Sequence, residues 1–308
     1  MARIGVVGAG RVGAVLSAAL SSAHGGERHE VIAAAGESAA SLERMAALLP
    51  GVSAGKPTDV ARSCDLLLLT VPDDMLENVV TQLVGAGAIR AGQVVCHTSG
   101  RHGLAVLERA SAVGARVIAM HPAMTFTGTA LDLDRLSGCV FGMTAGEGER
   151  EYAEGLVADL GGIAMWVPED KRTLYHAGLA HGANHLVTLV AQAMELLAAS
   201  GAEDPAATLR PLLTAALDNA LEQGDAALTG PIVRGDVNTV QAHLRDIADN
   251  APATVPSYVA MAKATADRAV LDGRLLPIRA ARLVAMLDDA LVRVGEVAPR
   301  RRSRSSSR

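Results

Sequence analysis

Aromatic residues are scarce in this sequence. Phe, Trp and Tyr make up 2% of its 308 residues, although half of the chain is hydrophobic. The core must therefore be built from aliphatic side chains, and the abundant alanine favours helices because it loses no side-chain entropy in them. A chain of this length is typical of two domains. We expect the second domain to be mainly helical.

Cysteine and long hydrophobic runs are also lacking. The three cysteines, Cys64, Cys96 and Cys139, form no CxxC pair, and we interpret them as buried, inert thiols. Their odd number, without a disulfide framework, fits a reducing compartment. No apolar run approaches the roughly 18 residues of a membrane span, and no leader-like stretch precedes the first strand pattern. These features predict a cytoplasmic protein with no membrane partner.

Charge of one sign is concentrated only at the end of the chain. The formal net charge of -5 is spread over the sequence, whereas residues 300–308 read RRRSRSSSR. A basic, serine-rich segment without apolar residues is expected to be disordered, so we expect a solvated tail over residues 299–308. An arm that touches nucleic acid or a membrane is the alternative. Elsewhere, nothing indicates a nucleic-acid partner.

Strand and helix patterns alternate through the first half of the chain. The run DLLLLTV at residues 65–71 is typical of a strand buried on both faces of a parallel sheet. The alternation predicts an α/β fold with a doubly wound parallel (Rossmann) sheet, and the strand pattern stops after Pro168. We therefore expect a Rossmann domain over residues 1–168 and an all-α domain over residues 169–298. The expected strands cover residues 4–7, 30–35, 65–71, 93–97, 115–120, 139–144 and 163–167. The expected longer helices cover residues 11–23, 38–49, 73–84, 149–160, 174–200, 204–223, 237–249, 255–271 and 278–294.

A glycine motif joins the first strand to the first helix. The loop reads GxGxxG, and its position between a strand and a helix makes it typical of dinucleotide binding. Gly8 suits the tight turn, Gly10 the close approach to a pyrophosphate, and Gly13 the packing of helix on strand. A Rossmann relic that binds nothing is the alternative. The residues expected to bind the dinucleotide here are Gly8, Ala9, Gly10, Arg11, Val12 and Gly13.

The end of the second strand bears on the choice between NADP and NAD. An NAD site usually carries an acidic residue there, but the strand ends in Ala-Ala-Ala-Gly. Ser38, Ser41 and Arg44 follow, and they suit the 2′-phosphate of NADP. Glu37 favours NAD, because its charge would repel that phosphate. We expect NADP, with Ser38 among its ligands, and keep NAD as the alternative.

Two further loops leave the carboxyl ends of predicted strands, where doubly wound folds bind ligands. We expect Val71 and Pro72 in the first loop to contact the cofactor, and His97 and Ser99 in the second to contact the substrate. Ordinary strand-to-helix turns are the alternative for both loops. His121 ends the next strand and is a candidate proton donor, since histidine titrates near neutrality.

A polar stripe runs along the first long helix of the second half. Tyr175, His176 and Asn184 interrupt alanine and leucine, and buried polar groups need partners. We place them against the substrate as catalytic candidates; a domain interface is the alternative. His181 and His185 have the spacing of a metal pair, but no third ligand is evident and we expect no metal.

Arg234 lies between small residues in the run TGPIVRGD, residues 229–236. A guanidinium suits the bidentate capture of a carboxylate, so Arg234 is a candidate for binding the substrate. An ordinary surface arginine is the alternative.

Together these stretches resemble a known family. The segments GVVGAGRVG, LTVPDD, HTSG, HPAM, YHAGLAHGANHLVTL and ALTGPIVRGDVNTVQAHL are similar to Rossmann-like oxidoreductases with a helical C-terminal domain of unknown function. That family includes alternative ketopantoate reductases of pantothenate biosynthesis. The layout is more distantly similar to pyrroline-5-carboxylate reductase and the 6-phosphogluconate dehydrogenase superfamily. Dimers through the helical domain are common among such proteins, so the resemblance implies a homodimer.

The resemblance implies an NADPH-dependent reduction of 2-dehydropantoate (ketopantoate) to pantoate. Asn184 matches the asparagine of typical ketopantoate reductases, but their lysine four residues earlier is Ala180 here. The proton donor must then be His176, Tyr175 or His121. An imine reductase resembling pyrroline-5-carboxylate reductase is one alternative, and a non-catalytic NAD(P)-binding sensor or docking protein is another.

Overall fold

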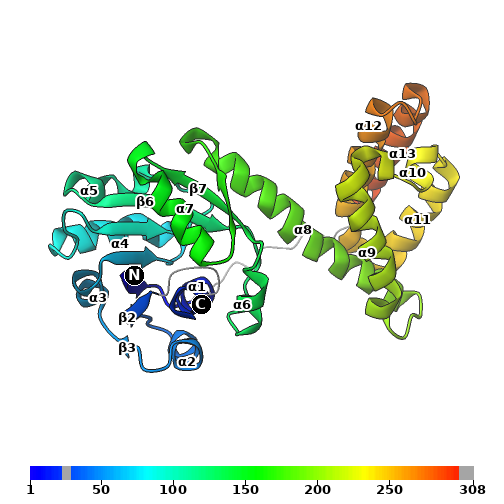
Figure 1. Ribbon diagram of the computed structural model, residues 1–308. Coiled ribbons are helices and arrows are strands. Elements are labelled where there is room, and N and C mark those ends of the chain that lie inside the picture. Colours follow the sequence, from blue (N-terminus) through cyan, green and yellow to red (C-terminus); the bar gives the residue numbers. More distant parts are fainter. Residues whose placement is uncertain (23–28, 298–308) are drawn as a thin grey trace, which may run out of the picture. The chain divides into compact units, whose positions relative to one another are not determined.

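The computed structural model describes residues 1–22 and 29–297 (Figure 1). The chain forms two compact units, Met1–Ala183 and the residues from Asn184 onward. The division falls inside the long helix α8 (Arg172–Ala199), whose first turns belong with the sheet. Pro168 follows the last strand, as the sequence predicts. The predicted basic tail, residues 299–308, lies outside the described residues.

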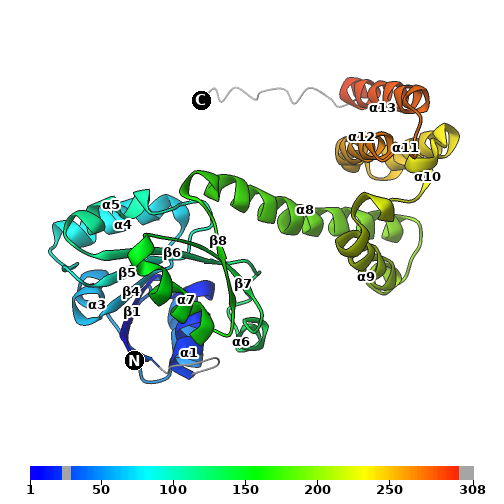
Figure 2. The ribbon, with the colours of Figure 1, turned by 45° about the horizontal axis from the view of Figure 1, so that its top comes forward.

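The first unit is built on one eight-stranded sheet with the order β3-β2-β1-β4-β5-β6-β7-β8 (Figure 2). All neighbours are parallel except β6 and β7. The predicted doubly wound Rossmann sheet is confirmed, with one antiparallel pair that the sequence did not indicate. The strands are β1 (Arg3–Val7), β2 (Glu30–Ala35), β3 (Ser53–Ala54), β4 (Leu66–Leu69), β5 (Val94–His97), β6 (Arg116–Pro122), β7 (Val140–Ala145) and β8 (Ile163–Trp166).

The helices of this unit cover both faces of the sheet and make two cores. The leucines of β4 show why. Leu66 and Leu68 belong to the core under α1 and α7, whereas Leu67 and Leu69 belong to the core under α3, α4 and α5. Successive side chains of a strand point to opposite faces, so an unbroken run of leucines can fill both cores. The helices are α1 (Arg11–Ser22), α2 (Ala39–Leu48), α3 (Pro57–Ser63), α4 (Asp73–Gly85), α5 (Glu108–Ala112), α6 (Leu131–Arg135) and α7 (Arg150–Asp159), and the 3₁₀ turns are η1 (Ala105–Leu107), η2 (Glu147–Glu149) and η3 (Glu169–Lys171).

The second unit is helical, as the sequence predicts. Its core lies between α11, α12 and α13, where side chains at helical spacing such as Val240, Leu244 and Ile247 are buried. Within the described residues no helix combines the length and the apolar character needed to cross a membrane. The elements are α9 (Pro205–Gln223), α10 (Pro231–Arg234), α11 (Val237–Asn250), α12 (Val255–Leu271) and α13 (Pro277–Val297), with 3₁₀ turns η4 (Gly224–Ala227) and η5 (Pro252–Thr254).

The elements missing from the sequence prediction are short. The strand β3 and the helices α3, α5 and α6 have seven residues or fewer, too few to show a clear hydrophobic period. The predicted strand over residues 115–120 is extended through His121 and Pro122, because these residues pair with Gly142 and Phe141 of β7. His121 therefore lies in a paired strand of the sheet, not in a loop.

Candidate functional site

The glycine loop packs tightly against the loop that follows β4. Gly8 has φ 101°, and a Cβ built there would lie 2.7 Å from the carbonyl carbon of Thr70. The Thr70 hydroxyl donates to the Gly8 carbonyl at 2.6 Å. A Cβ on Gly13 would collide with the same hydroxyl and lie 2.6 Å from the Gly8 carbonyl oxygen. Only glycine fits at these two positions, which brings α1 close to the end of β1.

A cavity of about 760 Å³ opens above this loop. It runs from the end of β2 past the glycine loop to the loops after β4 and β5. Of the residues predicted to bind the dinucleotide, only Gly13 does not line it, consistent with its packing against the loop after β4. Ser99, predicted to bind substrate, also lines it. The predicted cofactor residues on its wall are Gly8, Ala9, Gly10, Arg11, Val12, Ser38, Val71 and Pro72.

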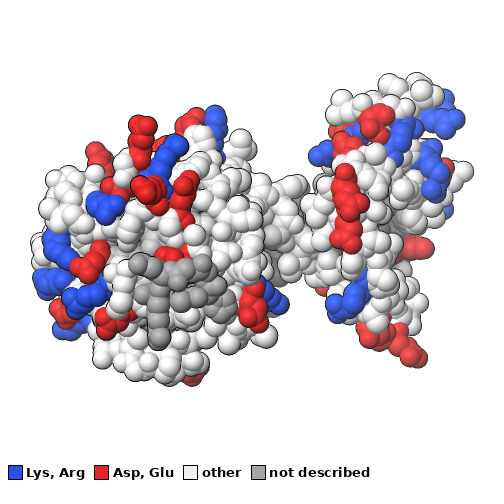
Figure 3. All heavy atoms as spheres, viewed as in Figure 1, with Lys and Arg blue, Asp and Glu red and all other residues white. Residues whose placement is uncertain are grey.

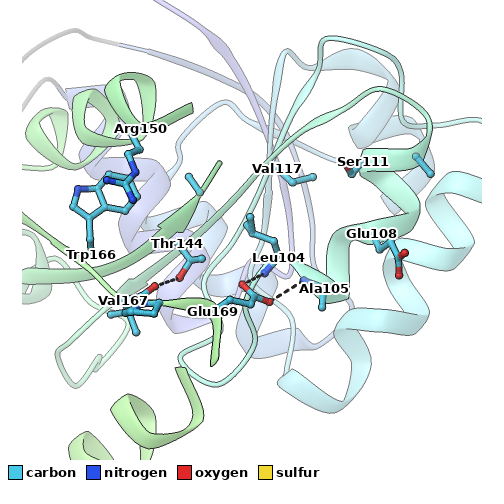
Figure 4. Close-up of a pocket in the computed structure, with 13 residues that line it drawn as sticks. Leu104, Ala105, Glu108, Ser111, Val117, Thr144, Arg150, Trp166, Val167 and Glu169 are labelled. Atoms are coloured by element: carbon cyan, nitrogen blue, oxygen red, sulfur yellow. Dashed lines mark hydrogen bonds between the residues drawn. The ribbon is translucent and has the colours of Figure 1, made fainter. Parts of the chain in front are cut away.

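A larger hollow of about 1040 Å³ lies elsewhere in the first unit, beside η1, α5 and the last residues of β7 and β8 (Figure 4). Two of its charged groups are already engaged. The Glu169 carboxylate accepts from the Leu104 and Ala105 amides at 2.8 and 3.1 Å. The Arg150 guanidinium stacks over the Trp166 ring at 4.7 Å. We take the smaller cavity as the candidate site, because it collects the free amide groups at the start of α1, which suit an anion.

Two arginines converge at the β2 end of the cavity. A Cβ built on Gly128 would lie 2.8 Å from Arg44 Nε and 2.9 Å from Arg11 Cγ, so both side chains pack around this glycine. Neither arginine has a hydrogen bond or an ion pair with an acidic group in the described part of the chain. Ser38 caps α2, and its hydroxyl accepts from the Ser41 amide at 3.1 Å. Arg11 lines the cavity and Arg44 lies next to it around Gly128, so these two charges exceed the single opposite charge of Glu37, which also lines this end.

Three of the predicted catalytic residues meet where the end of β6 lies against the start of α8. His121 Nδ1 lies 2.9 Å from the Tyr175 hydroxyl, and the two rings are T-shaped. The His176 ring is also edge-on to His121, with centroids 5.7 Å apart. We call His121, Tyr175 and His176 the aromatic triplet.

Two glycines make room for the aromatic triplet. A Cβ on Gly100 would lie 2.6 Å from His176 Cδ2 and 2.9 Å from His121 Nε2. A Cβ on Gly142 would lie 2.5 Å from the Tyr175 ring and hydroxyl. Gly100 adjoins Ser99, which lines the cavity, so the triplet lies directly beside the cavity wall. No sequence pattern indicates that Gly100 and Gly142 adjoin these rings.

Burial sets the protonation of the triplet. It lowers the pKa of His121 to about 4, helped by the nearby charges of His176 and Arg172 and opposed by Asp73. Burial also raises the pKa of Tyr175, although Arg172 acts in the opposite direction. Near pH 7 the site therefore holds a neutral imidazole beside a protonated phenol.

His97 does not meet the expectation of a substrate contact. Its side chain is fully buried, the Ser99 amide donates to Nδ1 at 3.1 Å, and Nε2 lies 2.8 Å from the Gly103 carbonyl. Both ring nitrogens are thus used within the protein, and burial lowers the pKa of His97 to about 4. His97 shapes the turn that carries Ser99. A histidine at a strand end can point into the core as readily as into a cleft, and the sequence pattern did not separate the two.

Arg172 is a functional candidate that the sequence analysis missed. It begins α8, yet its side chain is buried on the sheet and donates to the Ser99 carbonyl at 2.6 Å. A Lys-Arg pair at a helix start is ordinarily a solvated face, so no sequence signal marked it.

Asn184 and Arg234 belong to the second unit. Asn184 is exposed on α8. The Arg234 guanidinium is 63% exposed and pairs with the Asp236 carboxylate at 2.8 Å. Their predicted roles toward a substrate stay predictions.

Comparison with protein families separates the chain into two matched regions. Residues 1–122 match a Rossmann-like domain, and residues 139–265 match a domain of unknown function, DUF2520. The chain therefore contains a region similar to a Rossmann-like domain and a region similar to DUF2520. The resemblance found in the sequence is thereby confirmed. The Rossmann-like match includes the glycine loop and His121, and the DUF2520 match includes Tyr175 and His176.

Solved structures share this fold at low sequence identity. A protein assigned as an NADP oxidoreductase from Bacteroides fragilis is 19% identical with a TM-score of 0.73, and the match covers 86% of this chain and 98% of that one. A reductive aminase from Aspergillus terreus, in complex with NADPH and ethyl levulinate, is 18% identical with a TM-score of 0.61, covering 94% and 99%. Pyrroline carboxylate reductase from Plasmodium falciparum, with NADP bound, is 13% identical with a TM-score of 0.55, covering 92% and 98%. A search of the curated proteins gives no match.

Proposed function

We propose that the protein is an NADPH-dependent reductase of the keto group of a small 2-keto acid, with 2-dehydropantoate as the first substrate to test. The observation that carries this proposal is the hydrogen-bonded pair of His121 and Tyr175 beside the Ser99 end of the cavity. A neutral imidazole and a protonated phenol, held 2.9 Å apart at the edge of a dinucleotide fold, are equipped to supply a proton to a nascent alkoxide.

The cavity fits NADP along its whole length. A dinucleotide in this fold rests its diphosphate on the N-terminus of the helix after the glycine loop and its adenosine ribose at the end of the second strand. At that end, Arg11 and Arg44 have no acidic partner in the described residues, and each would form a charge-assisted hydrogen bond to a 2′-phosphate. Glu37 also lines the cavity and favours NAD, but two arginines outweigh one carboxylate. Three of the solved structures of this fold contain NADP or NADPH.

The reactive end follows from the order of the strands. The sheet runs β2-β1-β4-β5-β6, so a cofactor with its ribose at β2 extends toward the loops after β4 and β5. Val71 and Pro72 would flank its nicotinamide, and Ser99 would face the substrate. When bound, NADPH supplies the hydride that reduces the carbonyl carbon.

Within this proposal, Tyr175 donates the proton to the carbonyl oxygen. Its raised pKa keeps the phenol protonated, whereas the lowered pKa of His121 leaves few protonated imidazoles near pH 7. In the tautomer with hydrogen on Nδ1, His121 donates to the Tyr175 oxygen and frees the phenolic hydrogen for the substrate. His176 lies beside His121, with its ring edge-on to that imidazole. In typical ketopantoate reductases a lysine provides this proton. The corresponding residue here is Ala180, and Tyr175 would take over the role.

Asn184 and Arg234 are the candidates for contacts with the substrate carbonyl and carboxylate, and Arg234 would exchange Asp236 for the substrate.

We also propose a homodimer. Between Arg172 and Glu195, α8 has no charged residue, and Figure 3 shows few charges on the viewed surface of this stretch. Val187 on α8 is 68% exposed and Leu221 on α9 is 78% exposed, and uncharged apolar helix faces of this kind suit a second copy.

Reduction of a cyclic imine is a second candidate, because a reductive aminase and a pyrroline carboxylate reductase share the fold. The buried Arg172 argues for a carbonyl substrate. Hydride transfer to a carbonyl creates negative charge, which a nearby guanidinium stabilises, whereas an iminium ion enters with a positive charge that the guanidinium repels.

The assay follows absorbance of reduced nicotinamide while 2-dehydropantoate and then pyrroline-5-carboxylate are added. We expect oxidation with the keto acid and a loss of about two orders of magnitude in kcat for Tyr175→Phe. Tyr258→Phe is the matched control, since its hydroxyl also lies 2.9 Å from a histidine, His243, but in the second unit. Turnover of only the imine would favour the second candidate. Binding of NADPH without turnover of either compound would favour a non-catalytic NAD(P)-binding sensor or docking protein.

A further inference from the structure

Arg172 carries a buried charge with no counterion. Its relative exposure is 1%, the smallest of any arginine or lysine described. In the described part of the chain its guanidinium meets no carboxylate within ion-pair distance, and its Nε is the one buried side-chain nitrogen or oxygen without a hydrogen-bond partner. Burying an unpaired charge is costly, and burial lowers the pKa of Arg172. A fold that keeps such a group requires an explanation beyond stability.

The guanidinium joins three parts of the site. Its Nη2 donates to the Ser99 carbonyl at 2.6 Å, in the turn after β5. Its Nη1 donates to the Thr144 hydroxyl at 3.0 Å and the Gly142 carbonyl at 3.3 Å, both on β7. Tyr175 and His176 follow Arg172 in the first turn of α8. One side chain therefore fixes the turn that lines the cavity relative to β7, whose Gly142 pairs with His121, and relative to the helix that carries Tyr175 and His176.

A second contact from the same segment strengthens this connection. Glu169, in η3 just before α8, accepts from the amides of Leu104 and Ala105, at the far end of the same turn. The Glu169 carboxylate lies so close to this turn that a Cβ on Gly103 would collide with it. The turn from Ser99 to Ala105 is thus held at both ends by the residues that lead into α8.

The guanidinium also acts on the triplet through its charge. The Tyr175 hydroxyl and the His176 ring, both from α8, lie against His121. The Arg172 guanidinium reaches Gly142, the strand partner of His121, and Asp73 on α4 acts on His121 through its charge. Of these, His176 and Arg172 oppose a proton on His121, and Asp73 favours one. Arg172 is the only one of them that stays positively charged at every working pH.

We propose that Arg172 is the positioning residue of this site: it fixes the Ser99 turn against β7 and α8, and it holds a permanent positive charge at Gly142, the strand partner of His121, where it opposes a second positive charge on that imidazole. The consequence for catalysis rests on the proposed reductase function. The consequence for His121 does not, because it concerns the protonation of the resting protein. The two can therefore fail separately.

The decisive test is an NMR titration of the histidine side chains in the full chain, with His121→Gln used to assign the His121 resonance. We expect the wild-type His121 midpoint to lie near pH 4, so the titration runs from pH 7.5 to below that value. In Arg172→Met its midpoint should move upward by several tenths of a pH unit, because one permanent positive charge is gone while burial, the first cause of the low pKa, remains. Arg150→Met, which removes an arginine that stacks on Trp166, is the matched control and should leave the midpoint unchanged.

Arg172→Lys separates the charge from the hydrogen bonds. Lysine keeps the charge but cannot reproduce the planar fork that reaches three acceptors. We expect its His121 midpoint to stay low, while kcat for the reduction falls about tenfold or more because the Ser99 turn loosens. If Arg172→Met does not fold, Arg172→Lys still decides: a low midpoint with reduced kcat supports the proposal, and a full kcat contradicts it. An unchanged His121 midpoint in folded Arg172→Met overturns the electrostatic part, whether or not any substrate turns over.

Discussion

Replacing Gly100 by alanine tests the packing of the aromatic triplet with a single methyl group. The added carbon would lie 2.6 Å from His176 Cδ2 and 2.9 Å from His121 Nε2, whereas ordinary contacts between such atoms are about 3.5 Å or more. Gly100 has no left-handed backbone angle, so the backbone itself accepts alanine. The whole effect of Gly100→Ala therefore falls on the two imidazoles.

The expected magnitude follows from these distances. The rings must move by roughly 0.5–1 Å to relieve the clash, and overpacking of this kind destabilises a protein by about 1–3 kcal/mol. A misplacement of about 1 Å at a reacting centre lowers the rate by about two orders of magnitude. We expect the dissociation constant of NADPH to change little, because the glycine loop and the β2 end of the cavity are untouched.

The assay compares kcat, the NADPH dissociation constant and the free energy of unfolding in Gly100→Ala and in Gly155→Ala. Gly155 lies in α7, and a Cβ there meets no atom within 4 Å, so alanine should be neutral or slightly stabilising. A folded Gly100→Ala protein with wild-type kcat would refute the assignment of the triplet to the reaction.

Three other results are expected. Arg44→Ala should weaken the binding of NADPH about tenfold and leave that of NADH nearly unchanged, as measured by fluorescence titration, because a charge-assisted hydrogen bond to the 2′-phosphate is lost. Burial lowers the pKa of His97 from 6.5 to about 4, so between these pH values the unfolded chain binds more protons than the folded one. The free energy of unfolding should therefore fall by up to about 3 kcal/mol as the pH drops from about 6.5 to 4. His97→Gln should reduce this pH dependence in denaturant melts. Val187→Asp should convert the protein from a dimer to a monomer of 31.6 kDa in sedimentation, and a wild type that is already monomeric would contradict the proposed assembly.

The fold was largely predictable because local patterns and global architecture agree. The leucine run of β4, the GxGxxG turn and the cap at Ser38 each follow from local physical chemistry, and all three are present in the structure. The antiparallel pairing of β6 with β7 was not predictable in this way. It depends on how the segment between them returns to the sheet, and that segment contains only the five-residue helix α6.

The candidate site was predictable in its polar residues but not in their surroundings. His121, Tyr175 and His176 stood out because histidine and tyrosine interrupt apolar patterns. Sequence position could not show that His97 turns into the core and that Arg172 does the same, because the direction of a side chain at a strand end or helix start depends on tertiary packing. The two glycines that accommodate the triplet belong to the same class of tertiary information.

Transfer of deuterium tests the central claim most directly. The protein is incubated with NADPH carrying deuterium at the reactive C4 position and with 2-dehydropantoate, and the product is analysed by mass spectrometry. The account predicts pantoate with one deuterium on the carbon of the former keto group, and a loss of this product in Tyr175→Phe but not in Tyr258→Phe. Tight binding of NADPH with no deuterium in any product of the keto acid would contradict it.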